Sequence, residues 1–231
     1  MSAFGSIWWP WGAAAIGWSV ISFVIGIFRT KKRSQDVAPL AQELGFRFVP
    51  WIGPEAAPRF ATALFQKDPG ATCKNLMTGS YAGLDVQVFD YSCTTGSVQN
   101  STSTVQTVAV YSQNTDLPTF ALAPKNLADK ILAALQHQNV ELDCPPGVSL
   151  HYAVHGSEKE RIRPWFDGRR IRFIESLDRS KGWHIEGAGK TLVLYRYARR
   201  VKPAELRDFL QETSSIAQSF LEGATAATSA R

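Results

Sequence analysis

The feature that most constrains this chain of 231 residues is an uncharged, apolar run near its start. No Asp, Glu, Lys or Arg occurs between Met1 and Phe28, and residues 7–28 read IWWPWGAAAIGWSVISFVIGIF. At about 1.5 Å per residue, a helix over this run would be about 33 Å long, which matches the hydrocarbon core of a bilayer. The run therefore predicts a transmembrane helix.

Basic residues follow the run directly, and they predict its orientation. Positive charge on one side of a span keeps that side in the cytoplasm, so the N-terminus should lie outside and the rest of the chain inside. A cleaved signal peptide would instead carry its basic residues before the apolar run. The predicted contacts with the membrane surface are Arg29, Lys31, Lys32 and Arg33.

Aromatic and small residues within the run suggest how it would sit in a membrane. Tryptophan rings favour the boundary between lipid and water, and the predicted interface aromatics are Trp8, Trp9 and Trp11. Ala13 with Gly17, and Ser22 with Gly26, are small-residue pairs spaced for close helix packing. The lipid bilayer is therefore an expected partner, and a homo-oligomer through the membrane helix is possible.

The cysteines and the charges exclude several classes of protein. Cys73, Cys93 and Cys144 share no metal-ligand spacing, so they predict free thiols in a reducing compartment rather than disulfides. The formal net charge is +5, but the basic residues are dispersed and no nucleic-acid-binding motif accompanies them. We expect no nucleic-acid partner.

Residues 186–196, EGAGKTLVLYR, contain the ending of a phosphate-binding loop. Such a loop needs a glycine five residues before Gly189, where His184 stands, and a helix after it. Residues 191–197 are instead rich in β-branched and aromatic side chains, which favour a strand. We therefore predict a β-hairpin that turns at Gly187-Ala188-Gly189, and no nucleotide.

These patterns predict an α+β fold. It consists of an N-terminal transmembrane helix followed by a mostly antiparallel sheet domain in two similar halves, each ending in an amphipathic helix. Cys144-Pro145-Pro146-Gly147 marks the join between the halves. The predicted divisions are 1–33 for the anchor and basic segment, 34–144 and 145–222 for the halves, and 223–231 for a disordered tail.

In the first half, helical spacing and strand alternation predict short elements. The residues from Leu84 to Tyr91 alternate and then slip phase at Val88-Phe89, which indicates a bulge or a strand covered on both faces. A polar loop over 92–103 separates them from a hairpin partner at 104–111. The other elements are helices at 36–44, 58–65 and 126–137 and strands at 46–49 and 119–122.

In the second half, Tyr152 and Val154 share one face of a strand with Leu150. Ser157 and Glu160 have the spacing of a capping box at a helix start. A strand near residues 171–174 and a helix over 203–221 follow. The apolar stripe of that helix comprises Leu206, Phe209, Leu210, Thr213, Ile216, Ala217 and Phe220.

The order of these elements resembles a group of bacterial membrane-anchored proteins of unknown function. The resemblance covers residues 75–221 and is carried by apolar, glycine and turn positions. The segments concerned are GSYAGLDVQVFDYS, TVAVYS, LPTFALAP, HYAVHGSEKERIRPWF and WHIEGAGKTLVLYR, followed by the closing helix. It implies a similar fold and a location in the bacterial inner membrane; the basic residues after the apolar run place the large domain in the cytoplasm. The resemblance implies no activity.

Residue types that carry chemistry are present, but their spacing predicts no catalytic, cofactor or metal site. His151 and His155 would lie about 13 Å apart along a strand, too far to chelate one metal. No Gly-x-Ser-x-Gly motif occurs. The carboxylates Asp85, Asp90 and Glu186 could each serve as catalytic acids, but on alternating strands we expect them to face solvent and pair with lysine or arginine.

Arginine-rich stretches at 169–172 and 196–202, with Trp165, Trp183 and Tyr197 nearby, could bind an anionic ligand or lipid head groups. A solvated face is the favoured interpretation. The leading functional hypothesis is a non-catalytic cytoplasmic domain that binds or scaffolds proteins. The alternatives are a small-ligand-binding domain or enzyme with a pocket hidden from the sequence, and peripheral contact with anionic lipid.

Overall fold

A computed structural model describes residues 31–53, 60–66, 70–95, 101–125, 139–140 and 151–221. Several predictions fall outside these residues. They are the run 7–28 with its small-residue pairs and with Trp8, Trp9 and Trp11, the basic Arg29, the helix over 126–137, the join at 144–147 and the tail 223–231.

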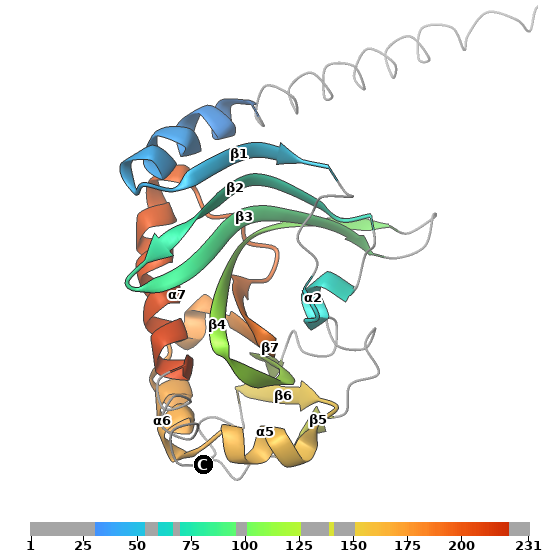
Figure 1. Ribbon diagram of the computed structural model, residues 1–231. Helices are drawn as coiled ribbons and strands as arrows, with labels where there is room; N and C mark the ends of the chain where they lie inside the picture. The colour runs from blue at the N-terminus through green and yellow to red at the C-terminus, as the bar shows by residue number, and fades with distance from the viewer. Residues whose placement is uncertain are drawn as a thin grey trace, which may run out of the picture.

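The described residues form one sheet with helices around it (Figure 1). The strands are β1 (Arg47–Ile52), β2 (Thr72–Tyr81), β3 (Leu84–Thr95), β4 (Thr102–Pro124), β5 (Asn139–Val140), β6 (Tyr152–Gly156) and β7 (Trp183–Arg196). The α-helices are residues 31–43, α2 (Ala63–Gln66), α5 (Lys159–Trp165), α6 (Gly168–Ser176) and α7 (Leu206–Leu221). Two 3-10 turns are η1 (Arg179–Lys181) and η2 (Pro203–Glu205).

The long strand β4 organises the sheet. All the strand pairs are antiparallel, in the order β1-β2-β3-β4-β6-β5, and β7 pairs with β4 from Val108 to Leu122. The first part of β4 therefore lies between β3 and β7, and its last part lies between β6 and β7. Figure 1 shows β4 curving strongly as it passes from one group of strands to the other.

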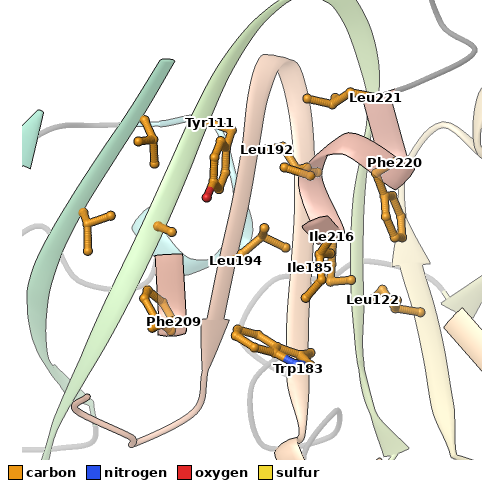
Figure 2. Packing of buried hydrophobic residues seen from close by; sticks show 14 of the residues in the cluster. Tyr111, Leu122, Trp183, Ile185, Leu192, Leu194, Phe209, Ile216, Phe220 and Leu221 are labelled. Carbon is orange, nitrogen blue, oxygen red and sulfur yellow. The ribbon is translucent and has the colours of Figure 1, made fainter. Parts of the chain in front are cut away.

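Each face of the sheet carries a hydrophobic cluster. The larger cluster lies between the sheet and the helices 31–43, α5, α6 and α7, and we call this side the helical face. Figure 2 shows Phe209, Ile216 and Phe220 of α7 packed toward Leu192 and Leu194 of β7. On the opposite side, which we call the α2 face, Leu64 and its neighbours cover a second cluster that includes Phe89, Tyr91, Val193 and Tyr195.

Several predicted features are confirmed. All seven residues predicted for the apolar stripe of the last helix are buried, because α7 lies along the sheet as its spacing indicated. The helix predicted at 36–44 is the C-terminal part of helix 31–43, and it ends at Gly45 with a positive φ of 70°. Tyr152 and Val154 are both buried on β6.

The phase slip at Val88-Phe89 has a clear cause. Both side chains are buried, because β3 is covered on both faces, and the register of β3 with β4 is continuous. The bulge lies in β2 instead, where the register with β3 shifts between Lys74 and Met77. Asn75 lies within this bulge with a φ of +55°.

The predicted hairpin at Gly187-Ala188-Gly189 is wrong, because β7 continues through these residues without reversing. The glycines serve a different purpose. A Cβ on Gly187 would lie 2.4 Å from the ring of Phe120, so the ring can pack on β7 only where a side chain is absent. Gly189 adopts a φ of +54° beside the register shift near Leu117.

Three further local predictions are corrected. Residues 171–174 form helix α6 rather than a strand, because Ile171 and Ile174 are one helical turn apart and both buried. The segment at 119–122 is the last part of β4, not a separate strand. The capping box at Ser157 and Glu160 does not form, since α5 begins after Glu158, which makes no side-chain cap.

The predicted fold class is also wrong. Strand β4 pairs with β3 from the first predicted half and with β6 and β7 from the second, so the two halves share one sheet. Among the described residues, no helix is long and apolar enough to cross a membrane. The structure therefore does not support the predicted transmembrane helix or the single-pass inner-membrane location. Both predictions rest on residues 7–28, which lie outside the described part.

Candidate binding groove

A groove of about 540 Å³ lies between α6, η1 and α7. Its apolar lining comes from Phe173, Leu177, Trp183 and Ile216. Its polar lining comprises Ser176, Asp178, Lys181, Asp208, Gln211, Glu212 and Ser215. A mixture of apolar surface and a few polar groups is typical of binding sites, so this groove is the candidate site of the described residues.

Local interactions hold the α6 wall of the groove in place. The side chain of Asp167 caps α6 by accepting from the backbone N–H of Arg170 at 2.9 Å. The Arg170 side chain is buried and donates to the carbonyl oxygens of Trp165 and Phe220 at 3.0 and 3.1 Å. Arg170 therefore ties α5, α6 and α7 together.

The floor of the groove is closely packed. Trp183 is 2% exposed and stacks on Phe209 with 5.9 Å between ring centroids. The guanidinium of Arg196 lies 5.0 Å from the centroid of the Trp183 ring, within the range of a cation–π contact. Figure 2 shows Trp183 between β7 and α7, close to Ile185. An occupant would meet a fixed apolar surface.

The rim of the groove is acidic. Three of its side chains are carboxylates, Asp178, Asp208 and Glu212, against the single ammonium of Lys181. Lys181 and Glu212 form an ion pair at 2.6 Å between η1 and α7. The hydroxyl and backbone N–H of Ser180 hydrogen-bond to Asp178 and lower the pKa of its carboxyl group, so this group is charged at neutral pH. The rim therefore favours cationic groups.

Two predicted carboxylates lie inside the protein, not in solvent. Glu186 is 1% exposed and accepts from the Tyr195 hydroxyl at 2.7 Å and from the Leu64 backbone at 2.9 Å. Burial, followed by the charge of Glu186, raises the pKa of Tyr195, so its hydroxyl remains a donor. Glu186 thereby fastens α2 to the sheet. Asp85 is exposed, as predicted.

Asp90 is the second buried carboxylate, and it holds a residue that was predicted to touch the membrane. Arg33 donates to both oxygens of Asp90, from Nε at 2.5 Å and from a terminal nitrogen at 2.7 Å, and its side chain is 7% exposed. Arg33 is therefore an internal residue. Lys31 and Lys32 are exposed at the start of the same helix.

The three histidines that the structure describes lie at different places in the fold. His151 is exposed before β6, His155 lies on β6, and His184 is buried in β7 with its ring stacked on Tyr195 at 4.9 Å. Among the described residues, no group of three or more His, Cys, Asp or Glu could hold a metal ion. Of the predicted arginine stretch at 169–172, Arg169 and Arg172 are exposed, and Arg170 is the structural exception.

The sequence did not reveal the groove, because one of its walls was misassigned. Asp167 stands at the N-cap position and Ile171 and Ile174 have helical spacing, so these residues carried the signal for α6. On α7, Asp208 with Glu212, and Gln211 with Ser215, are four residues apart and share the polar side of the helix.

Comparisons with known proteins give a fold. No family model matches this sequence, and no curated protein matches it. Among solved structures, the chain is similar to the mycobacterial trehalose monomycolate transport factor A, TtfA, with a TM-score of 0.57 and 13% sequence identity. The match covers 82% of this chain and 94% of that one. The two proteins share the fold of the sheet and its helices.

Proposed function

We propose that this chain is a non-catalytic binding domain that serves a transport process by holding a segment of a partner protein in the α6–α7 groove. The observation that supports the transport role is the fold that it shares with TtfA, a transport factor, over 94% of the solved chain of that protein. The resemblance to bacterial proteins of unknown function is compatible with this role and remains a prediction.

The chemistry of the groove favours a particular kind of partner segment. Phe173, Leu177 and Ile216 offer an apolar lining, and Asp178, Asp208 and Glu212 give the rim a negative charge. A segment with an apolar side chain flanked by lysine or arginine would be complementary to both features. The Lys181–Glu212 ion pair would be exchanged for contacts with the partner.

Site-specific photo-crosslinking in the native host tests this proposal. A photoreactive residue in place of Ser215, on the groove rim, should capture a component of a transport system that mass spectrometry identifies. Asp208→Lys should reduce the adduct about tenfold, since the loss of one charge-assisted contact and the new repulsion together exceed 1.4 kcal/mol.

The matched control is Glu160→Lys. Glu160 is also an exposed acid in the first turn of a helix, but it lies on α5 and does not line the groove. It should leave the adduct unchanged. An adduct that is equally strong with Asp208→Lys, or that forms only with proteins unrelated to transport, would contradict the proposal.

The size of the groove favours a second candidate function, the binding of a small molecule. A volume of about 540 Å³ lies within the range of about 300–1,000 Å³ that is usual for small-ligand sites. Native mass spectrometry of the full chain purified from its host should then show a bound molecule of constant mass. Ser215→Trp, which fills the groove from its rim, should remove it; an unchanged spectrum would rule out this site.

A further inference from the structure

We propose that the surface around the first described turn of helix 31–43 is a docking face for acidic phospholipid headgroups at a membrane surface. The face consists of Lys31, Lys32, Arg199, Arg200 and Lys202 with Trp51 beside them, and we call it the basic end. This contact is peripheral and requires no membrane-spanning helix. It is also independent of the groove.

The buried Asp90 brings distant parts of the chain together at the basic end. Besides Arg33, the Asp90 carboxylate has the Nε of Arg200 at 3.8 Å. It also accepts from Asn75 at 2.9 Å and from Thr107 at 3.0 Å. Arg33 precedes β1 and Arg200 follows β7, so one carboxylate sets the start of helix 31–43 beside the segment after β7.

Backbone contacts fix that segment against β4. The N–H of Thr107 donates to the carbonyl oxygen of Arg199 at 3.1 Å, and the N–H of Val201 donates to the Thr107 hydroxyl at 2.9 Å. Val201 is buried, whereas its neighbours Arg200 and Lys202 are exposed. The cations are therefore presented by an ordered backbone.

Positive charge exceeds negative charge at the basic end. Lys31, Lys32, Arg199, Arg200 and Lys202 are all exposed, and the Lys202 side chain is 79% exposed. The carboxylates on helix 31–43 and residues 199–205 are Asp36, Glu43 and Glu205; Glu205 lies 3.5 Å from Lys202, and Glu43 lies 2.8 Å from Arg207. Asp90 is already matched by Arg33. Five exposed cations thus outnumber three carboxylates, one of which, Glu43, is paired with Arg207.

Trp51 adds an aromatic side chain to the same region. It is 59% exposed, and among the described residues it is the large hydrophobic side chain that the fold leaves in solvent. Trp51 pairs with Lys74 on β2, and Lys74 pairs with Asp90 on β3. Paired residues share a face of a sheet about 5 Å apart, so Trp51 lies about 10 Å from Asp90. Figure 1 shows the end of β1 and the first turn of the blue helix toward the same end of the sheet.

This combination matches a lipid surface. Acidic leaflets attract each nearby lysine or arginine, and tryptophan settles at the level of the headgroups. Several cations and one aromatic ring on one end of the molecule can touch a planar surface together.

Flotation of the full-length chain with vesicles tests the proposal. Two kinds of vesicle are compared. One contains phosphatidylcholine with about a third of phosphatidylglycerol, which gives it the negative surface of an acidic leaflet. The other is pure phosphatidylcholine. We expect a stronger partition onto the acidic vesicles that falls as salt is raised. The double variant Lys31→Glu with Lys202→Glu should weaken the partition about tenfold or more. Trp51→Ala should weaken the partition at low salt and at high salt alike, because its contribution is not electrostatic.

The control pair is Arg172→Glu with Lys190→Glu, two exposed cations on α6 and β7 that change the net charge equally. It should leave the partition within about twofold of the wild type, because net charge acts weakly beyond a Debye length. Equal partition onto neutral vesicles, or equal losses from the two pairs, would overturn the proposal. The proposal would also be overturned if a DNA oligonucleotide displaced the chain from acidic vesicles when the DNA phosphate concentration was below that of the acidic lipid.

Discussion

At the scale of single residues, the most consequential side chains of this protein are charged groups inside it. Asp90 is 5% exposed and is satisfied by Arg33, Asn75 and Thr107, which come from three different elements. Taking a carboxylate and a guanidinium out of water is costly, and the pair is stable only because nearly all of its polar atoms find partners. Removing one member of the pair should therefore lower the free energy of unfolding more than removing both.

Asp90→Ala should lower the free energy of unfolding by about 3–5 kcal/mol, because it leaves Arg33 buried without its anion. The double variant Arg33→Met with Asp90→Leu should lose clearly less than the single variant, since it removes both charges and fills their volume. Some loss will remain, because Asn75 and Thr107 also lose an acceptor. Urea denaturation measures both values; a double variant less stable than Asp90→Ala would contradict this account.

At the scale of the elements, the sequence before α6 carried a helix signal, the N-cap residue Asp167, but the isoleucines within α6 suggested a strand. Isoleucine favours strands, and this preference suggested a strand at 171–174. The residues form a helix because Asp167 caps its N-terminus and because helical spacing places Ile171 and Ile174 together in the hydrophobic cluster. A residue that precedes an element can therefore carry more information than the residues within it.

The caps of α5 and α6 allow a direct test. Asp167→Ala should destabilise the protein by about 1 kcal/mol, because the side chain caps α6 through the N–H of Arg170. Ser157→Ala is the matched control, since Ser157 has the sequence of a capping box but α5 carries no side-chain cap. It should change stability by less than about 0.5 kcal/mol. Thermal unfolding followed by circular dichroism compares the two, and equal losses would refute the assignment.

The elements differ in how far the sequence could predict them. The stripe of α7 and the face of helix 31–43 were predictable, because one covered side is enough to impose helical spacing. The close approach of the Phe120 ring to Gly187 was not, because these residues are far apart in the sequence and only the pairing of β4 with β7 brings them together. The groove and the contacts of Asp90 with Arg33, Asn75, Thr107 and Arg200 could not be predicted for the same reason, since they assemble from segments that only the fold brings together.

At the scale of the whole molecule, the shared sheet determines how the protein can unfold. The pairing of β4 with β7 spans the predicted division at residues 144 and 145, and each strand buries the other's apolar side chains. If either part were removed, the other would expose both an open sheet edge and a hydrophobic face. We therefore expect one cooperative unfolding transition rather than two.

A cleavable chain tests this expectation. A specific protease site placed between Cys144 and Pro145 allows the folded protein to be cut, and the fragments should remain associated. Once separated in denaturant, neither fragment should regain native near-ultraviolet circular dichroism alone, and mixing should restore it, because the helical face needs α7 and β7 against β3 and β4. Cys73 reports the same event: burial raises the pKa of its thiol to about 12, so it should resist alkylation at neutral pH in the complex and react in the isolated fragment. A fragment of residues 145–231 that unfolds cooperatively by itself would show instead that the second half is a domain in its own right.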